Sequence, residues 1–191
     1  RAMLVSGAYS WHNGVFVQVH VPQRMQFGMK EGTVTYAQRL ADEGYRTAYL
    51  GKWHADWKKG PLDYGYERVS ALRADPDSLA RANQPPEDDL AFLSRFESRT
   101  VSRRTVKWAG GDDWPVWAEI DGPVEGRRPY FMAKRAQVVL EELCSGDDPW
   151  LMEVHFVEPH DPYAPHVDFA RRYDAGEIPL PGNWREEYVN K

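Results

Sequence analysis

The chain has 191 residues, with 24 lysines and arginines against 29 aspartates and glutamates, so its formal net charge at pH 7 is −5. This length suits one compact domain. A weakly acidic chain gives no support for nucleic-acid binding, which depends on a basic surface. No stretch approaches the ~18 consecutive apolar residues of a membrane-spanning helix, so no membrane partner is expected. The single cysteine, Cys144, excludes an intrachain disulfide and a cysteine-based zinc site.

The first residues form an apolar run behind Arg1, without an initiator methionine. We expect residues 1–6 to form a short helix that ends at Gly7, where a left-handed backbone is cheapest. Residues 15–21 alternate in part and predict a strand. The opening of the chain also predicts an internal piece of a longer protein, whose signal region would precede Arg1. Cellular location and oligomeric state are therefore left open.

A helix followed by a strand is predicted in the first half of the chain. Over residues 33–43 the apolar side chains recur at helical spacing, and Gly44 ends the pattern. Residues 45–51 are rich in aromatic and β-branched side chains, which favours a strand. A helix and a strand joined by a single glycine are typical of an α/β sheet.

The middle of the chain is less regular, and we interpret residues 70–128 as a variable insertion. Residues 73–89 are polar and rich in proline, as in a surface loop. Apolar spacing predicts a helix over residues 88–99. Residues 106–120 surround a Gly-Gly-Asp-Asp turn and predict a β-hairpin with several tryptophans.

Regularity returns in the last third of the chain. Residues 130–146 predict a long amphipathic helix, and residues 149–157 a strand whose nearly continuous apolar character indicates a buried parallel strand. A polar loop follows at 158–163, and residues 171–191 resemble a surface segment. The predicted fold class is therefore α/β, with a mixed, mostly parallel sheet flanked by helices.

Polar side chains directly follow both predicted strands. Lys52 and His54 come after the first strand, and His160 follows the second. Ligands of open α/β sheets bind beyond the carboxyl ends of the strands. Two residues apart on an extended backbone, Lys52 and His54 are expected to point to one side. A fixed positive charge and two imidazoles suit an anion, such as a sulfate or phosphate ester.

Other conspicuous side chains have ordinary explanations. His155 lies inside the predicted strand and is expected to pack or bond locally, and His12 is expected to be a turn residue. The tryptophans of the hairpin could form a sugar-stacking platform, although packing within the hairpin explains them as well. A non-catalytic module that binds a sulfated glycan therefore stays open as an alternative.

The residues around Lys52 carry a family resemblance. Residues 44–54 read Gly-Tyr-Arg-Thr-Ala-Tyr-Leu-Gly-Lys-Trp-His and resemble the signature of the sulfatase family. Residues 61–67 are similar to the family's Pro-x-x-x-Gly-Phe-Asp segment, although Tyr66 and Glu67 stand where phenylalanine and aspartate are usual.

Three further segments extend the likeness. Residues 150–163 resemble the family's strand and Pro-His-x-Pro loop, and residues 178–181 its following segment. Residues 1–7 are similar to the end of the nucleophile motif Cys-x-Pro-x-Arg and the short helix after it. The resemblance covers the chain apart from the 70–128 insertion, so residues 1–191 are interpreted as an incomplete sulfatase catalytic domain.

The resemblance implies a fold and a reaction. Sulfatases belong to the alkaline phosphatase superfamily, so the chain would form part of its α/β sandwich. The family hydrolyses sulfate monoesters through a formylglycine nucleophile and a divalent cation, usually calcium. Matching the motifs residue by residue implies that Arg1 holds the formylglycine, that Lys52 and His160 bind the sulfate, and that His54 is a candidate base beside the nucleophile.

The same resemblance places the nucleophile four residues before Arg1 and the metal ligands outside the chain, so no metal ligand is assigned to it. The chain alone is therefore expected to be inactive, and the parent protein to be a sulfuric ester hydrolase. A phosphonate monoester or phosphodiester hydrolase of the same superfamily stays open as an alternative, because Lys52, His54 and His160 would serve either anion. The natural substrate is not predicted.

Overall fold

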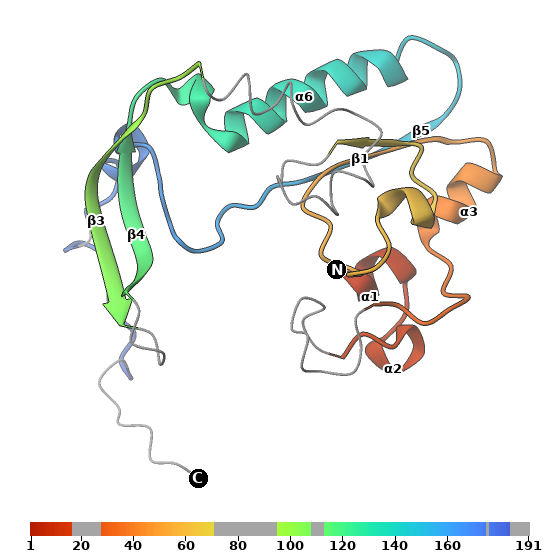
Figure 1. Ribbon diagram of the computed structural model, residues 1–191, viewed down its shortest axis with the longest axis horizontal. Coiled ribbons are helices and arrows are strands. Elements are labelled where there is room, and N and C mark those ends of the chain that lie inside the picture. Colours follow the sequence, from red (N-terminus) through yellow and green to blue (C-terminus); the bar gives the residue numbers. More distant parts are fainter. Residues whose placement is uncertain (17–27, 71–94, 108–112, 175, 184–191) are drawn as a thin grey trace. The chain divides into compact units, whose positions relative to one another are not determined.

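The computed structural model describes residues 1–16, 28–70, 95–107, 113–174 and 176–183. The chain divides into two compact units (Figure 1). The first unit comprises residues 1–97 and 123–160, and the second comprises residues 98–122 and 161–191.

The first unit is built on a parallel sheet with the strand order β2-β1-β5. The strands are β1 (Arg46–Gly51), β2 (Arg68–Ser70) and β5 (Trp150–His155). Ala48 of β1 pairs with Arg68 on one side and with Met152 on the other. The carboxyl ends of β1 and β5 therefore lie side by side, since Gly51 pairs with His155.

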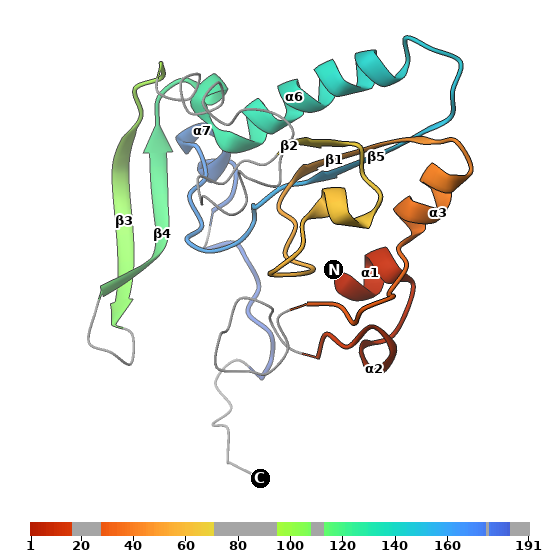
Figure 2. The same ribbon diagram turned by 45° about the vertical axis from the view of Figure 1, so that its right-hand side comes forward.

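Helices cover the two faces of this sheet. Figures 1 and 2 show α6 (Arg128–Leu143) along one face and α3 (Tyr36–Asp42) with the amino-terminal helices on the other. Because side chains alternate along a strand, β1 and β5 each contribute to two apolar cores. The core on the α6 side contains Ala48, Leu50, Met132, Val139 and Leu143. The core on the other side contains Ala37, Tyr49, Tyr66 and Val69.

Short helices complete the first unit. The helices α1 (Ala2–Ser6) and α2 (Ser10–Asn13) are each followed by a left-handed glycine, and Gly7 has a φ of 61°. The 3-10 turns η1 (Pro61–Tyr64) and η2 (Val124–Gly126) precede β2 and α6. A third core joins α1 to η1 through Ala2, Val5, Met29, Ala55 and Tyr64.

The second unit is an antiparallel hairpin with a short helix. Its strands are β3 (Arg99–Lys107) and β4 (Asp113–Asp121), and its helix is α7 (Val167–Ala170). Arg99 and Asp121 form an ion pair of 2.8 Å across the hairpin. The buried imidazole of His166 contacts the carbonyl oxygen of Gly122 at 2.7 Å and caps α7 by accepting a hydrogen bond from its backbone.

The predicted fold class is confirmed: the structure is α/β, with a parallel sheet and flanking helices. The helix expected over 33–43 begins only at Tyr36, because Thr35 caps it in a capping box with Gln38. The strand of 45–51, the helix of 130–146, the hairpin of 106–120 and the helix of 1–6 are all present, with shifted ends.

Three expectations about local structure need correction or fall outside the described residues. The helix predicted over 88–99 is wrong at its end, because Arg99 opens a strand, and residues 88–94 are not among those described. The strand predicted over 15–21 does not include Val15 or Phe16, and its remainder is likewise not described. Strand β5 is only half-buried, because it lies at the edge of the described sheet.

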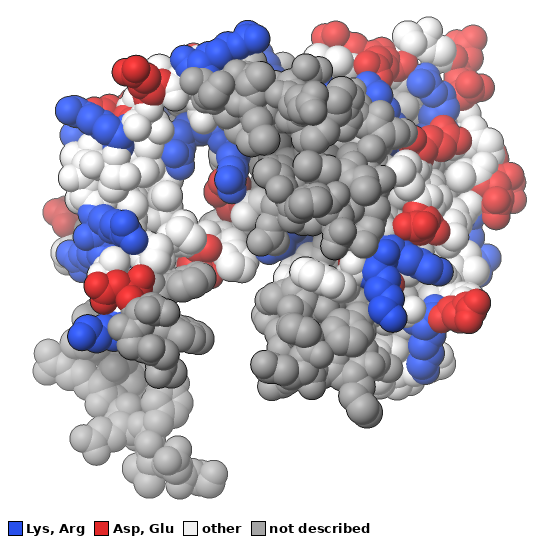
Figure 3. Space-filling view, in the orientation of Figure 1, with Lys and Arg blue, Asp and Glu red and all other residues white. Residues whose placement is uncertain are grey.

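One face of the molecule carries side chains of both charges. Figure 3 shows acidic and basic side chains interspersed on the face in view. None of the helices that the structure describes has both the length and the apolar character needed to cross a membrane.

Candidate active site

The backbone turns sharply where β1 ends. Gly51 has a φ of 95°, and a Cβ at this position would collide with the carbonyl oxygen of His155. The neighbouring Lys52 donates its backbone N–H to that same carbonyl at 3.0 Å. Only glycine combines the left-handed conformation with so close an approach of two strands. Gly51 thus fixes the point at which the chain leaves the sheet, directly before Lys52.

The reason given for placing Lys52 and His54 on one side is wrong. That expectation assumed an extended backbone through both residues. The strand ends at Gly51, and His54 itself has a left-handed φ of 56°. A positive φ is uncommon in residues other than glycine, and the alternation of an extended strand does not apply beyond Gly51.

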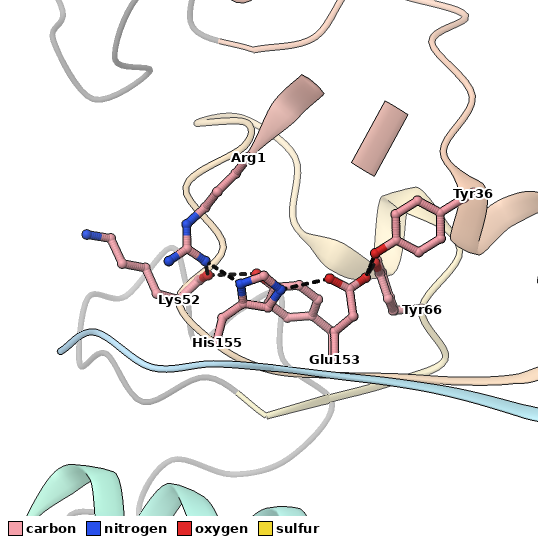
Figure 4. Close-up of polar contacts among 7 residues, drawn as sticks. Arg1, Tyr36, Lys52, Tyr66, Glu153 and His155 are labelled. Atoms are coloured by element: carbon pink, nitrogen blue, oxygen red, sulfur yellow. Dashed lines mark hydrogen bonds and ion pairs between the residues drawn. The ribbon is translucent and has the colours of Figure 1, made fainter. Parts of the chain in front are cut away.

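Arg1 reaches the turn after β1 from the start of the chain. Its Nη1 donates a hydrogen bond to the carbonyl oxygen of Lys52, a residue 51 positions away. The hydroxyl of Tyr49 donates to the same carbonyl oxygen at 2.6 Å. The backbone of Lys52 is therefore held by three groups, which are Arg1, Tyr49 and the carbonyl of His155 (Figure 4).

The Nη1 atom of Arg1 also contacts a histidine on β5. It lies 2.8 Å from Nδ1 of His155, and Nε2 of that ring lies 2.7 Å from a carboxylate oxygen of Glu153. A guanidinium can only donate and a carboxylate can only accept. This pattern assigns the Nε2-protonated tautomer to His155, with Nδ1 accepting from Arg1.

Two tyrosines hold the other carboxylate oxygen of Glu153. The hydroxyls of Tyr36 and Tyr66 both donate to Oε1, as Figure 4 shows. Burial acts to raise the pKa of Glu153, but the bonds from His155 and the two tyrosines outweigh it, and the pKa lies below its usual range. Burial and the adjacent carboxylate raise the pKa of Tyr36 to about 12, and the same two causes raise the pKa of Tyr66.

An aromatic cluster fixes the histidine ring. Tyr49 stacks on His155 with ring centroids 4.9 Å apart and an interplanar angle of 14°. Tyr49 also packs edge-on against Trp53 and Tyr66. Burial is the main reason that the pKa of Tyr49 is raised, so its hydroxyl stays a donor. The ring plane of His155 is therefore set by packing as well as by hydrogen bonds.

His160 lies in the turn that follows β5. Its backbone N–H donates to the carbonyl oxygen of Val157 at 3.1 Å. Since β1 and β5 are adjacent and parallel, the loops that carry Lys52 and His160 leave the same edge of the sheet. Of the four residues predicted for the site, the structure records direct contact between Arg1 and Lys52.

The polar pair on β5, Glu153 and His155, was not predicted as part of the site. His155 was expected to pack or bond locally, and it does both with Tyr49 and Glu153, but its contact with Arg1 was not expected. The signal was present in the sequence, because two polar residues alternate in an otherwise apolar strand and therefore share one face. Tyr36 and Tyr66 carried no such signal, since aromatic residues at those positions also suit a core.

Within the described residues, no group of three histidine, cysteine, aspartate or glutamate side chains is arranged to hold a metal ion. The described part of the chain therefore offers no complete ligand set for a divalent cation. What the described site offers is one guanidinium held by neutral acceptors, beside the turn that carries Lys52.

Comparison with known proteins decides the family. The model of the sulfatase family matches residues 1–191, which is the whole chain. The chain belongs to the sulfatase family. The recognition made from residues 44–54 and 150–163 is therefore confirmed at the level of the family.

Two curated sulfatases are similar to this chain. An uncharacterized sulfatase of Escherichia coli strain K12, YidJ, is 23% identical over 206 residues, covering 100% of the chain and 34% of that protein. A sulfatase of Formosa agariphila is 29% identical over 171 residues, covering 80% of the chain and 27% of that protein. The chain thus spans about a third of the length of the curated relatives it matches.

Proposed function

We propose that the protein carrying this chain hydrolyses sulfate monoesters, and that Arg1, Lys52, His54 and His160 belong to its active site. Membership of the sulfatase family supports hydrolysis of a sulfate ester. The observation that carries the proposal for this chain is the bond from the Arg1 guanidinium to the backbone of Lys52. It brings two cationic residues, distant in sequence, to the carboxyl edge of one parallel sheet, where α/β proteins bind ligands.

The proposed roles follow from the chemistry of each group. Lys52 carries a compact positive charge that suits a sulfate oxygen. His160 binds the sulfate or the leaving oxygen, and an imidazole can supply a proton there near neutral pH. Arg1 orients the nucleophile, and His54 is the base beside it. Charge stabilisers of this kind act on the charge that develops in the transition state.

The proposed nucleophile is a residue of the full protein that lies before Arg1. The resemblance implies a formylglycine, made from a cysteine or serine four residues before Arg1 in the full protein. The divalent cation, usually calcium in the family, would likewise be held by residues outside the described ones. A full sequence with neither cysteine nor serine at that position would contradict the catalytic proposal.

The deciding experiment compares ester classes with the full protein that carries this chain. Turnover of 4-nitrophenyl sulfate is measured against an aryl phosphonate monoester and an aryl phosphodiester. We expect the sulfate ester to have the highest kcat/KM. Strong phosphonate or phosphodiester cleavage without sulfatase activity would assign the protein to the neighbouring hydrolases of the superfamily instead.

A further inference from the structure

The residues Glu153 and His155 place polar groups on a face of β5 that otherwise builds a core. Met152 and Val154 point to the opposite face and pack against the core beneath α6. The side chains of Glu153 and His155 are only 12% and 18% exposed. A buried carboxylate is costly unless it is fully hydrogen-bonded. Core packing alone therefore does not explain why Glu153 and His155 occupy these positions.

Both oxygens of the Glu153 carboxylate accept hydrogen bonds. One oxygen accepts from the hydroxyls of Tyr36 and Tyr66, and the other accepts from Nε2 of His155. With both oxygens engaged, the carboxylate has a fixed orientation. It in turn fixes which nitrogen of the imidazole carries the proton, as carboxylates do for catalytic and metal-binding histidines.

The histidine then presents a lone pair to Arg1. Its Nδ1 accepts from Nη1 of Arg1 at 2.8 Å, while the carbonyl of Lys52 accepts from the same nitrogen. Both acceptors are neutral. A direct ion pair with a carboxylate would neutralise the guanidinium, whereas an imidazole orients it and leaves its positive charge available to an anion.

We infer that Glu153 and His155 are positioning residues for Arg1: Glu153 locks the imidazole, and the imidazole holds the guanidinium beside the turn of Lys52. This inference rests on the proposed function, because it takes Arg1 to be part of the sulfate ester site. A guanidinium has five N–H donors, so Arg1 keeps donors beyond those that its Nη1 uses, both for the nucleophile that it is proposed to orient and for an anion bound beside it.

The first test separates the two contacts of the imidazole in the full protein. In His155→Asn the amide oxygen can occupy the position of Nδ1 and accept from Arg1, whereas the longer side chain of His155→Gln reaches the position of Nε2 and loses that acceptor. We expect kcat/KM for an aryl sulfate to fall ~10-fold or more in His155→Gln. We expect His155→Asn to retain several times more activity than His155→Gln.

The second test asks whether Glu153 acts through Arg1. Glu153→Gln and Arg1→Lys are combined in a double-mutant cycle on kcat/KM, with Glu142→Gln as the matched control. Glu142 forms an exposed ion pair with Arg68 on the surface, and its loss should leave turnover unchanged. We expect Glu153→Gln to cost ~10-fold in the wild type and little once Arg1 is replaced, because the two changes remove the same interaction.

A binding measurement keeps this inference separate from the proposed function. The affinity for inorganic sulfate is measured by calorimetry in the wild type, Glu153→Gln, His155→Gln and Glu142→Gln, with thermal unfolding as the control for folding. We expect weaker sulfate binding only in the two variants of the β5 pair. Unchanged sulfate affinity with additive effects in the cycle would overturn the inference, whereas a wild type that binds sulfate but cleaves no sulfate ester would overturn only the proposed function.

Discussion

The Nε2 atom of His155 lies 2.7 Å from a carboxylate oxygen of Glu153, two positions earlier on the same strand. The spacing places both side chains on one face of β5, and that face also carries the aromatic cluster around Tyr49. A strand that would otherwise serve only the core thereby supports a cation that comes from the other end of the chain. Glu153 and His155 thus connect β5 to Arg1 and, through it, to the turn of Lys52.

The low pKa of Glu153 implies that the stabilisation that its carboxylate gives to the folded protein is lost in acid. Its pKa in the folded protein lies below the ordinary value of 4.5. A group with a depressed pKa stabilises the fold fully above its unfolded pKa, and this stabilisation is lost as the pH falls below that value and through the folded pKa. We expect the free energy of unfolding of the wild type to exceed that of Glu153→Gln most at neutral pH, with the difference shrinking below pH 4.5.

Urea unfolding of both proteins at a series of pH values measures this difference. Glu142→Gln serves as the control, because Glu142 is exposed and its ion pair contributes little. A difference between the wild type and Glu153→Gln that stays constant down to about pH 3 would contradict the ionised, hydrogen-bonded carboxylate.

Two glycines with similar backbone angles predict very different costs of substitution. Gly44 and Gly51 have φ values of 83° and 95°. A Cβ at Gly44 meets nothing within 4 Å, whereas a Cβ at Gly51 meets the backbone of His155. Gly44→Ala should therefore cost only the left-handed conformation, about 1–2 kcal/mol. Gly51→Ala must also push β1 and β5 apart, and we expect a cost of about 3 kcal/mol or more.

Thermal or urea unfolding of the two variants tests this contrast. Because Lys52 directly follows Gly51, the substitution Gly51→Ala should also reduce turnover of an ester by the full protein, and Gly44→Ala should not. Equal destabilisation by both substitutions would show that β1 and β5 can relax around the added methyl group.

Replacing the Asp56 carboxylate with an amide should lower the free energy of unfolding strongly. Its carboxylate is buried and accepts four hydrogen bonds, which come from the backbone N–H groups of Met29, Lys58 and Lys59 and from the hydroxyl of Tyr64. An asparagine offers one acceptor oxygen, so two of these donors would face an amide group. We expect Asp56→Asn to lower the free energy of unfolding by about 3 kcal/mol.

The matched control for that substitution is Asp63→Asn. Asp63 is exposed and accepts a hydrogen bond from the N–H of Gly60 at 2.7 Å. Its replacement should cost about 1 kcal/mol or less. Urea unfolding midpoints compare the two variants, and a loss in Asp56→Asn no greater than that in Asp63→Asn would refute the stabilising role of Asp56.

Local sequence patterns were sufficient to predict the fold class. Helical periodicity predicted the helices over 33–43 and 130–146. Aromatic and β-branched residues over 45–51 and an apolar run over 149–157 predicted the two parallel strands. The ends of these elements were less predictable, because they depend on individual contacts such as the cap that Thr35 supplies to α3. The expectation that residues 70–128 form a variable insertion stays a prediction.

For the candidate site, the sequence predicted where the residues lie along the sheet but not their contacts. Lys52 and His160 follow neighbouring parallel strands, as their place in the sequence indicated. The contacts of Arg1 could not be predicted, because its partners Lys52 and His155 lie 51 and 154 positions away and no local pattern encodes such pairing. The prediction that His54 points to the same side as Lys52 used a wrong premise, because the alternation of a strand ends where Gly51 turns the chain.

The largest kinetic effects are expected from replacing Lys52 and His160, which follow the two strands. If Lys52 and His160 bind the sulfate as proposed, alanine at either position removes a charge stabiliser from the transition state, and kcat/KM for an aryl sulfate should fall on the order of 10²-fold or more in the full protein. Lys134→Ala and His12→Ala replace exposed residues on α6 and α2 and should leave turnover unchanged. Because Lys52 is held through its backbone by Arg1, Tyr49 and His155, Lys52→Ala should lower the rate without a comparable loss of thermal stability. Full activity in Lys52→Ala and His160→Ala would show that the anion is bound elsewhere, even in a protein of this family.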